Sequence, residues 1–210
     1  MSKQHHYKAT IKWTGNKGTG TDNYRNYERS HQIIIENKSD ILGSSDPAFR
    51  GDKTKHNPED LLVSSLSSCH MLWYLHLCSE AGVIVTDYED NATGIMLETS
   101  NGGGQFSEVT LYPIVTVTEE NMIGKANELH KKANELCFIA NSVNFPVRHN
   151  PTAKYIDKEK NRKKQRTASI GLAIWRLKCP YEIFVQGSTA IILLNFCAKI
   201  PPQRKAAKPL

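Results

Sequence analysis

The sequence has no long apolar run and no segment with the character of a signal peptide. Its longest uninterrupted apolar stretch, Ala190–Leu194, is far shorter than the roughly 20 residues that a membrane-spanning helix needs. The N-terminal segment MSKQHHYKAT is polar and lacks the apolar centre of a secretion signal. We therefore expect a cytoplasmic protein with no membrane partner, in which thiols stay reduced unless they take part in a redox cycle.

The sequence also lacks the usual motifs of metal and nucleotide sites. Its five cysteines are odd in number and none forms a CxxC pair, which argues against a disulfide scaffold and a zinc cluster alike. The glycine-rich loop GNKGTG lacks the GxxxxGK spacing of a phosphate-binding loop and is typical of a turn. No cofactor and no metal are therefore expected. The cysteines are Cys69, Cys78, Cys137, Cys179 and Cys197.

Positive charge is concentrated at the C-terminal end of the chain. Residues 1–153 hold 14 lysines and arginines against 18 aspartates and glutamates, a balance of −4, whereas residues 154–210 hold 13 against 3, a balance of +10. This shift predicts a first domain over residues 1–153 and a basic extension over residues 154–210. The basic run Lys158–Arg166 favours at most weak binding of nucleic acid, and residues 181–196 have the pattern of a hairpin.

The periodicity of the first 150 residues predicts an α+β domain. Apolar and polar residues alternate over residues 7–13, as in a half-buried strand, and further strands are expected over 31–36, 83–89, 92–99, 106–118 and 145–149. Asn57-Pro58-Glu59 has the residues of a helix start, and Gly82 is placed to end that helix. A second helix is expected from residue 118 and an irregular segment over 37–56. This order indicates antiparallel sheet packed with two long helices.

Each of the two expected helices has an apolar face at helical spacing. The first face comprises Leu62, Ser65, Leu66, Cys69, Leu72, Trp73 and His76, and the second comprises Met122, Ala126, Leu129, Ala133, Leu136 and Ala140. His70 and His76 are six residues apart and fall on different faces, so they do not form a helical metal pair. Cys78 is interpreted as a core or surface residue.

A cysteine motif in the first helix carries the strongest functional signal. In HNPEDLLVSSLSSCHMLWYLHLC, residues 56–78, Cys69 follows Glu59 by ten residues, and Cys137 comes 68 residues later in ELCFIANSV. This pattern resembles the OsmC/Ohr family, the osmotically inducible proteins and organic hydroperoxide resistance proteins, over roughly residues 5–150. The resemblance implies an OsmC-like α+β fold, an intertwined homodimer with active sites at the interface, and a role in the oxidative stress response.

The resemblance also implies a thiol-dependent peroxidase. Cys69 would attack an organic hydroperoxide as its thiolate and become a sulfenic acid, which Cys137 would convert to a disulfide before further oxidation. An external dithiol, for example of the lipoyl type, would regenerate the enzyme. In much of the family a proline follows the second cysteine, whereas Phe138 follows it here. The alternative is an OsmC-like protein with little peroxidase activity that acts as a thiol-reactive binding protein or sensor.

A positive charge is needed to lower the pKa of the attacking thiol from its free value of about 8.5. One branch of the family places an arginine shortly before the Asn-Pro-Glu motif, where Arg50 lies, and we favour this residue. The other branch uses an arginine between the first two strands, where Arg25 and Arg29 are candidates. Ten helical residues, about 15 Å of rise, separate Glu59 from Cys69. If Glu59 orients the arginine, it must come from a second copy of the chain.

Apolar side chains near the two cysteines suggest a preference for organic hydroperoxides over hydrogen peroxide. Leu72, Trp73, Phe138 and Phe145 are the candidates for such a pocket. An ordinary hydrophobic core explains the same residues equally well.

Overall fold

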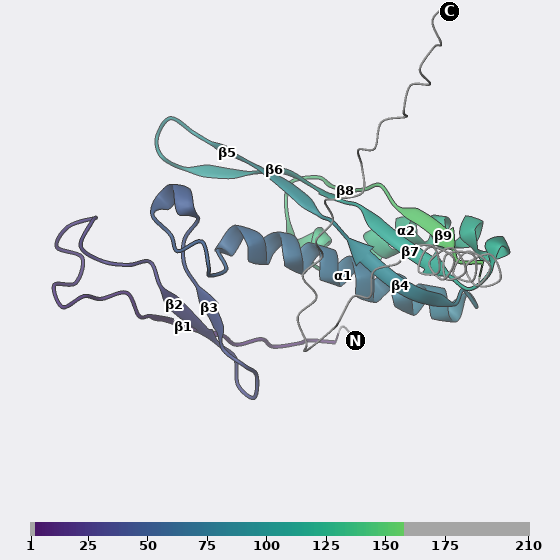
Figure 1. The fold of residues 1–210 in the computed structure, drawn as a ribbon, viewed down its shortest axis with the longest axis horizontal. Coiled ribbons are helices and arrows are strands. Elements are labelled where there is room, and N and C mark those ends of the chain that lie inside the picture. Colours follow the sequence, from purple (N-terminus) through teal and green to yellow (C-terminus); the bar gives the residue numbers. More distant parts are fainter. Residues whose placement is uncertain (1–2, 158–210) are drawn as a thin grey trace, which may run out of the picture. The chain divides into compact units, whose positions relative to one another are not determined.

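The computed structural model describes residues 3–157, which form an α+β fold with two α-helices (Figure 1). The helices are α1 (Pro58–Glu80) and α2 (Ile123–Leu136), and three short 3₁₀ turns are η1 (Pro47–Phe49), η2 (Glu120–Met122) and η3 (Ala140–Ser142). The strands are β1 (Thr10–Trp13), β2 (His31–Ile34), β3 (Ile41–Gly43), β4 (Val85–Asp90), β5 (Thr93–Glu98), β6 (Gly104–Leu111), β7 (Pro113–Val117), β8 (Val147–His149) and β9 (Thr152–Tyr155). The hairpin pattern expected over residues 181–196 and the basic run lie outside the described residues.

The strands form three small sheets, in the orders β1-β2-β3, β4-β7-β9 and β5-β6-β8. The first sheet is antiparallel throughout, as are the pairs β4–β7 and β5–β6. The last two strands differ from the sequence expectation because β8 runs parallel to β6 and β9 runs parallel to β7. A crossover through a helix such as α2 returns the chain in the same direction, which is the usual origin of a parallel pair.

The start of α1 agrees with the sequence prediction. The Asn57 side chain accepts a hydrogen bond from the Asp60 backbone N–H at 2.7 Å, Pro58 takes the first helical position, and Glu59 and Asp60 lie in the first turn. The Asn57 side chain satisfies one of the free N–H groups of the first turn, and proline has no N–H group to satisfy. The two carboxylates lie at the positive end of the helix dipole, where negative charge is favourable. The helix ends before Gly82, whose φ of +69° is the left-handed conformation that favours glycine.

The predicted apolar face of α1 is confirmed only in part, since Leu66 is buried and Leu62 and Trp73 pack against the core while some other members are exposed. The face buried in this chain comprises Leu66, His70, Tyr74 and Cys78. Only Leu66 belongs to the predicted face, whereas Leu72 is 63% exposed. Apolar residues are distributed around the whole helix, so spacing alone does not identify which side packs against the rest of the chain.

By length and composition α1 could cross a membrane, which a count of uninterrupted apolar residues does not show. One such helix is weak evidence, because a core helix of a soluble protein has the same length and composition. In this structure α1 packs against α2 and against the sheet that contains β7. Within the described residues, 22% of the apolar 18-residue stretch of α1 is buried.

The hydrophobic core forms two clusters along the buried face of α1. One cluster joins α1, α2 and β7 through Tyr74, Val115, Ala126 and Ala133, and a second joins α1 to β6 through Leu66 with Val109 and Leu111. The middle of the predicted α2 face is confirmed, since Ala126, Leu129 and Ala133 are buried. The predicted helix bounds are wrong at both ends: α2 begins at Ile123, Cys137 is its extended C-cap residue, and Ala140 lies in η3.

The segment over residues 37–56 is more regular than predicted. It contains β3, which pairs with β2, and the turn η1. Gly43 lies opposite His31, and a Cβ atom at Gly43 would come within 2.2 Å of the His31 ring. This close approach requires glycine and explains how a strand forms where the sequence shows no apolar alternation.

Strand β9 crosses the domain boundary predicted at residue 153, because it continues to Tyr155 in the sheet with β7. We predict that a chain ending at residue 157 keeps the melting temperature of the full chain. A matched chain ending at residue 151 should melt several degrees lower, since it loses β9 and the contacts of Ala153 and Tyr155 with the core. Thermal melting by circular dichroism checks both. If the chain ending at residue 157 melts at a lower temperature than the full chain, the domain extends beyond residue 157.

Candidate thiol active site

Cys69 lies in the middle of α1 and is half-buried. The neighbouring Ser65 and Ser68 hydroxyls donate to helix carbonyls, those of Leu62 at 2.8 Å and of Ser65 at 3.2 Å. These hydroxyls are therefore engaged by the helix itself. The serines contribute small side chains that leave the Cys69 sulfur open to approach.

Cys137 lies at the end of α2 and is only 1% exposed. Its sulfur accepts a hydrogen bond from the Ala140 backbone N–H at 3.4 Å, and its thiol interacts with the Cys69 thiol. Burial, followed by this interaction with Cys69, raises the pKa of the Cys137 thiol to about 11. The fold thus brings together two cysteines that are far apart in the sequence, one half-buried and one buried as a thiol.

The other cysteines have different positions. Cys78 is buried in the core cluster that also contains Tyr74, and burial raises the pKa of its thiol. A buried thiol of raised pKa is inert, which agrees with the expectation that Cys78 is structural. Cys179 and Cys197 lie outside the described residues.

Neither candidate arginine reaches Cys69 within the described part of this chain. Arg29 donates to the backbone carbonyls of Tyr27 at 2.7 Å and Tyr24 at 2.9 Å, and its guanidinium lies over both tyrosine rings. Arg50 is exposed, has a φ of +64°, and lies 5.9 Å from the centre of the Tyr24 ring. Arg25 is also exposed.

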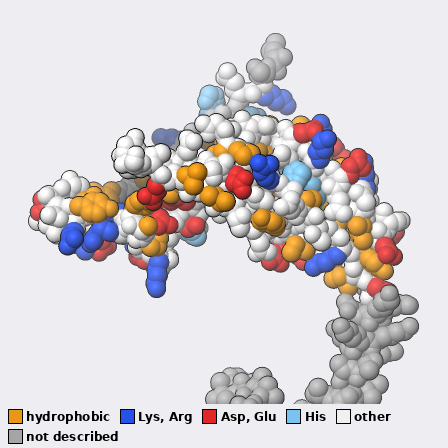
Figure 2. Space-filling view, turned by 90° about the horizontal axis from the view of Figure 1, so that it is seen from above, with side chains coloured by type: hydrophobic (Ala, Val, Ile, Leu, Met, Phe, Trp, Pro, Cys, Tyr) orange, Lys and Arg blue, Asp and Glu red, His pale blue; other side chains and the backbone are white. Residues whose placement is uncertain are grey.

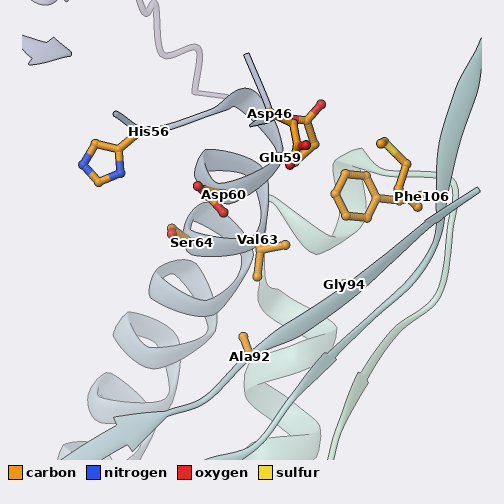
Figure 3. Close-up of a pocket in the computed structure, with 10 residues that line it drawn as sticks. Asp46, His56, Glu59, Asp60, Val63, Ser64, Ala92, Gly94 and Phe106 are labelled. Carbon is orange, nitrogen blue, oxygen red and sulfur yellow. The ribbon is translucent and has the colours of Figure 1, made fainter. Parts of the chain in front are cut away.

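Glu59 opens onto a cavity at the start of α1. One of its carboxylate oxygens, Oε2, is buried without a hydrogen-bond partner among the described residues. The cavity has a volume of about 570 Å³, with Asp46 from the start of η1 near Glu59 of the first turn of α1, and with Val63 and Phe106 beside the same space (Figure 3). Its remaining lining residues are His56, Asp60, Ser64, Ala92, Gly94 and Met96. The site is acidic on one side and apolar on the other.

The expected aromatic pocket is only partly present. Trp73 and Phe138 meet edge to face at 5.6 Å, and Phe138 and Leu72 are 69% and 63% exposed. Phe145 instead packs against Phe106 in the second core cluster. An apolar surface of Leu72, Trp73 and Phe138 therefore accompanies the two thiols, and Phe145 does not belong to it.

A buried pair of histidines next to the thiols was not predicted. His70 Nε2 lies 3.0 Å from His130 Nδ1, both residues are fully buried, and the Tyr74 ring stacks on His130 at 3.8 Å. Burial, and to a smaller extent His149, lowers the pKa of His70 to about 4. Burial, then His70 and His149, lowers the pKa of His130 to about 3. The sequence did contain one indication that His130 is buried, because it follows Ala126 by four residues and so falls on the predicted apolar face of the second helix.

Comparisons with known proteins assign the chain to a family. The family model described as OsmC-like protein matches residues 51–151. A solved OsmC-like protein of unknown function from Vibrio cholerae is 32% identical, with a TM-score of 0.63, and the match covers 70% of this chain and 99% of that one. The chain belongs to the OsmC-like family. No curated protein matches the sequence.

Two further OsmC-like folds come from more distant proteins. An organic hydroperoxide resistance protein from Elizabethkingia anophelis is 19% identical, with a TM-score of 0.54 and coverage of 74% of this chain and 100% of that one. One from Legionella pneumophila is 16% identical, with a TM-score of 0.51 and coverage of 72% and 99%. At these identities the likeness shows the fold alone. Glu59, Cys69 and Cys137 lie within the stretch that matches the OsmC-like model, whereas Arg29 and Arg50 precede it.

Proposed function

We propose that this protein is a cofactor-free thiol peroxidase that reduces organic hydroperoxides to alcohols. The observation that carries the proposal is the contact between the Cys69 and Cys137 thiols, which are 68 residues apart in the sequence. Two solved structures of the same fold have hydroperoxide resistance in their names, which agrees with this class of substrate.

The different burial of the two cysteines divides their roles. Only a thiolate attacks a peroxide, and with a pKa raised to about 11 the Cys137 side chain is almost wholly a thiol at pH 7. Its 1% exposure also keeps it from a dissolved substrate. We therefore assign the attack to the half-buried Cys69 and the resolving step to Cys137.

The reaction balances with these two thiols and one hydroperoxide. The Cys69 thiolate attacks the terminal peroxide oxygen, the O–O bond breaks, and the alkoxide takes up a proton and leaves as the alcohol. The Cys137 sulfur then displaces the oxygen of the Cys69 sulfenic acid as water, which forms the Cys69–Cys137 disulfide. An external dithiol, for example a lipoyl group, reduces this disulfide by exchange and is itself oxidised to a disulfide.

We also propose that a second copy of the chain completes each site. Glu59 and Cys69 share one helix and are separated by about 15 Å of rise, so they cannot meet within one chain. The buried, unpartnered Oε2 of Glu59 is a carboxylate oxygen that an arginine from the partner could satisfy. Arg50 suits this role better than Arg29, because carbonyls and aromatic rings already hold the Arg29 guanidinium.

The exposed apolar surface of the single chain supports a homodimer. Among the described strands, β1, β2 and β3 form a sheet of their own, and Ile11, Trp13 and Leu42 on this sheet are 61%, 42% and 53% exposed. A three-stranded sheet needs an apolar face packed against another element for stability. Strand β5 is exposed along its whole length, and Figure 2 shows separate groups of apolar side chains on one face of the molecule.

The direct test is consumption of peroxide by the purified full-length protein. With dihydrolipoamide as the reductant, cumene hydroperoxide should be reduced faster than hydrogen peroxide, because the exposed Leu72 and Phe138 and the half-buried Trp73 offer an apolar contact to the organic group. Absence of turnover with either peroxide, while the protein is folded and its thiols are reduced, would contradict the proposed activity.

We predict that two inactive variants restore activity when they form a mixed dimer. One chain carries Glu59→Gln with Cys69 intact, and the other carries Cys69→Ser with Glu59 intact. If Glu59 acts across the interface, equal mixing should recover about a quarter of wild-type turnover, because half of the dimers are mixed and each has one complete site. Turnover after subunit exchange, verified by native mass spectrometry, is the measurement.

The matched control places both substitutions in one chain. A Glu59→Gln/Cys69→Ser chain mixed equally with wild-type chain should form mixed dimers without a complete site, because the intact Cys69 then faces a glutamine. This control should therefore keep only the quarter of wild-type turnover that its wild-type homodimers supply. Half of wild-type turnover in the control and none in the test mixture would show that Glu59 acts within its own chain.

A further inference from the structure

The buried histidine pair links the two helices that carry the thiols. His70 immediately follows Cys69 on α1, and His130 precedes Cys137 by seven residues, which is about two turns of α2. The two rings are nearly parallel, with an interplanar angle of 6° and centroids 5.3 Å apart. The hydrogen bond between them therefore joins α1 to α2, one residue from Cys69 on α1 and about two turns from Cys137 on α2.

This hydrogen bond fixes the position of α1 along α2, which apolar contacts alone do not. The hydrogen bond joins His70 Nε2 to His130 Nδ1. The other ring nitrogens, His70 Nδ1 and His130 Nε2, have no hydrogen-bond partner among the described residues. Apolar side chains tolerate sliding of one helix along another, whereas a buried donor and acceptor lose their only partners if the helices shift. The pair thus favours one arrangement of α1 and α2.

The surroundings of the pair disfavour its protonation. The titratable groups that face it are Tyr74 from α1, stacked on His130, and His149 from β8, whose ring centre is 5.7 Å from that of His70. Tyr74 in turn meets Cys78 and Tyr88. None of these groups is a carboxylate, so an added proton would place an uncompensated positive charge between the helices.

We propose that the His70–His130 hydrogen bond is a positioning clamp that holds Cys137 at Cys69, and that protonation of the pair releases it. The two histidines act through the helices and do not touch the reacting sulfur atoms. The inference rests on the proposed redox role of the two cysteines. In this proposal, His70 and His130 set the distance between the two sulfur atoms, and formation of the disulfide becomes sensitive to acid.

The clamp is tested by a redox equilibrium that requires no peroxide. The protein dithiol and oxidised glutathione react to give the Cys69–Cys137 disulfide and two molecules of reduced glutathione, so atoms and electrons balance. The equilibrium constant measures how well the fold holds the two thiols together. A failure of the proposed function appears as absence of hydroperoxide turnover, whereas a failure of the clamp appears in this constant.

The main variant is His70→Leu/His130→Leu, in the full-length protein. Replacing both partners of a buried hydrogen bond with apolar groups of similar size costs little stability, so the fold should be retained. The equilibrium constant should fall about tenfold or more, because positioning is lost. The control Val83→Ala, a core residue outside the pair, should leave the constant within about threefold of the wild-type value. An unchanged constant in the double variant would overturn the clamp.

A second measurement uses the wild-type protein and keeps the proposal testable if the double variant does not fold. Between pH 7 and pH 4 glutathione stays a thiol, and ionisation of a protein thiol would favour the disulfide as the pH falls. Release of the clamp has the opposite sign and requires protonation of His70, whose pKa burial lowers to about 4. The constant should therefore decrease between pH 5 and pH 4, measured wherever circular dichroism shows native helix content. A constant that stays level or increases would refute the acid release.

Discussion

Replacing Cys69 with serine should reduce hydroperoxide turnover by more than about 1,000-fold, because a serine hydroxyl is not ionised at neutral pH and forms no sulfenic acid. The matched control is Cys78→Ser, which removes another thiol of the same helix. Cys78 is buried against Tyr74 and away from the proposed chemistry, so this variant should keep most of the turnover. Steady-state consumption of cumene hydroperoxide, with melting temperatures to verify folding, compares the two. Equal losses in both variants would remove Cys69 from its proposed role.

Replacing Cys137 with serine should separate the two steps of the reaction. Cys69 should still form a sulfenic acid, since its attack on the peroxide does not consume Cys137. The sulfenic acid then has no resolving thiol and should oxidise further to the sulfinic acid. Labelling with a sulfenic-acid probe and peptide mass spectrometry locate the oxidised residue. A label on Cys78 in place of Cys69 would show that the attacking cysteine is misassigned.

Acid should destabilise the folded protein through His70 and His130. Burial lowers their pKa values to about 4 and about 3, whereas the value in the unfolded chain is 6.5. Below pH 6.5 the unfolded chain therefore binds protons that the folded chain does not, so stability is complete above pH 6.5 and is lost as the pH falls toward 4. From pH 7 to pH 5 we expect a loss of about 2 kcal/mol in the free energy of unfolding for each histidine.

Urea unfolding at pH 7, 6 and 5 measures this loss. The His70→Leu/His130→Leu variant serves as the control, because it removes both titrating groups from the core. Its free energy of unfolding should change much less over the same range. If wild type and variant lose stability equally, other groups cause the acid sensitivity.

Local signals in the sequence were sufficient to predict the first helix and the turn between β5 and β6. The Asn57 cap, the Pro58 start and the Gly82 end act within one or two turns, so their effect is readable without knowledge of the fold. The turn around Gly102 joins β5 and β6 for the same reason. The buried side of α1 could not be read, because it depends on where α2 packs and the helix is apolar on every side.

Contacts between distant segments account for the other differences. The parallel pairing of β8 and β9 depends on how α2 returns the chain to the sheets, and β3 depends on the close approach of Gly43 to His31. At the site, the motif gave Cys69 and Cys137, which the fold brings together. The partnership of His130 with His70 involves residues 60 positions apart and leaves no local pattern.

The most direct test of the proposed chemistry is to map disulfides after treating the reduced protein with one equivalent of cumene hydroperoxide. Peptide mass spectrometry without reducing agent should find a single new bond between Cys69 and Cys137 of the same chain, because the two thiols already interact in the folded chain. A bond only between the Cys69 residues of two chains, or between Cys69 and Cys78, would contradict the assignment of Cys137 as the resolving thiol.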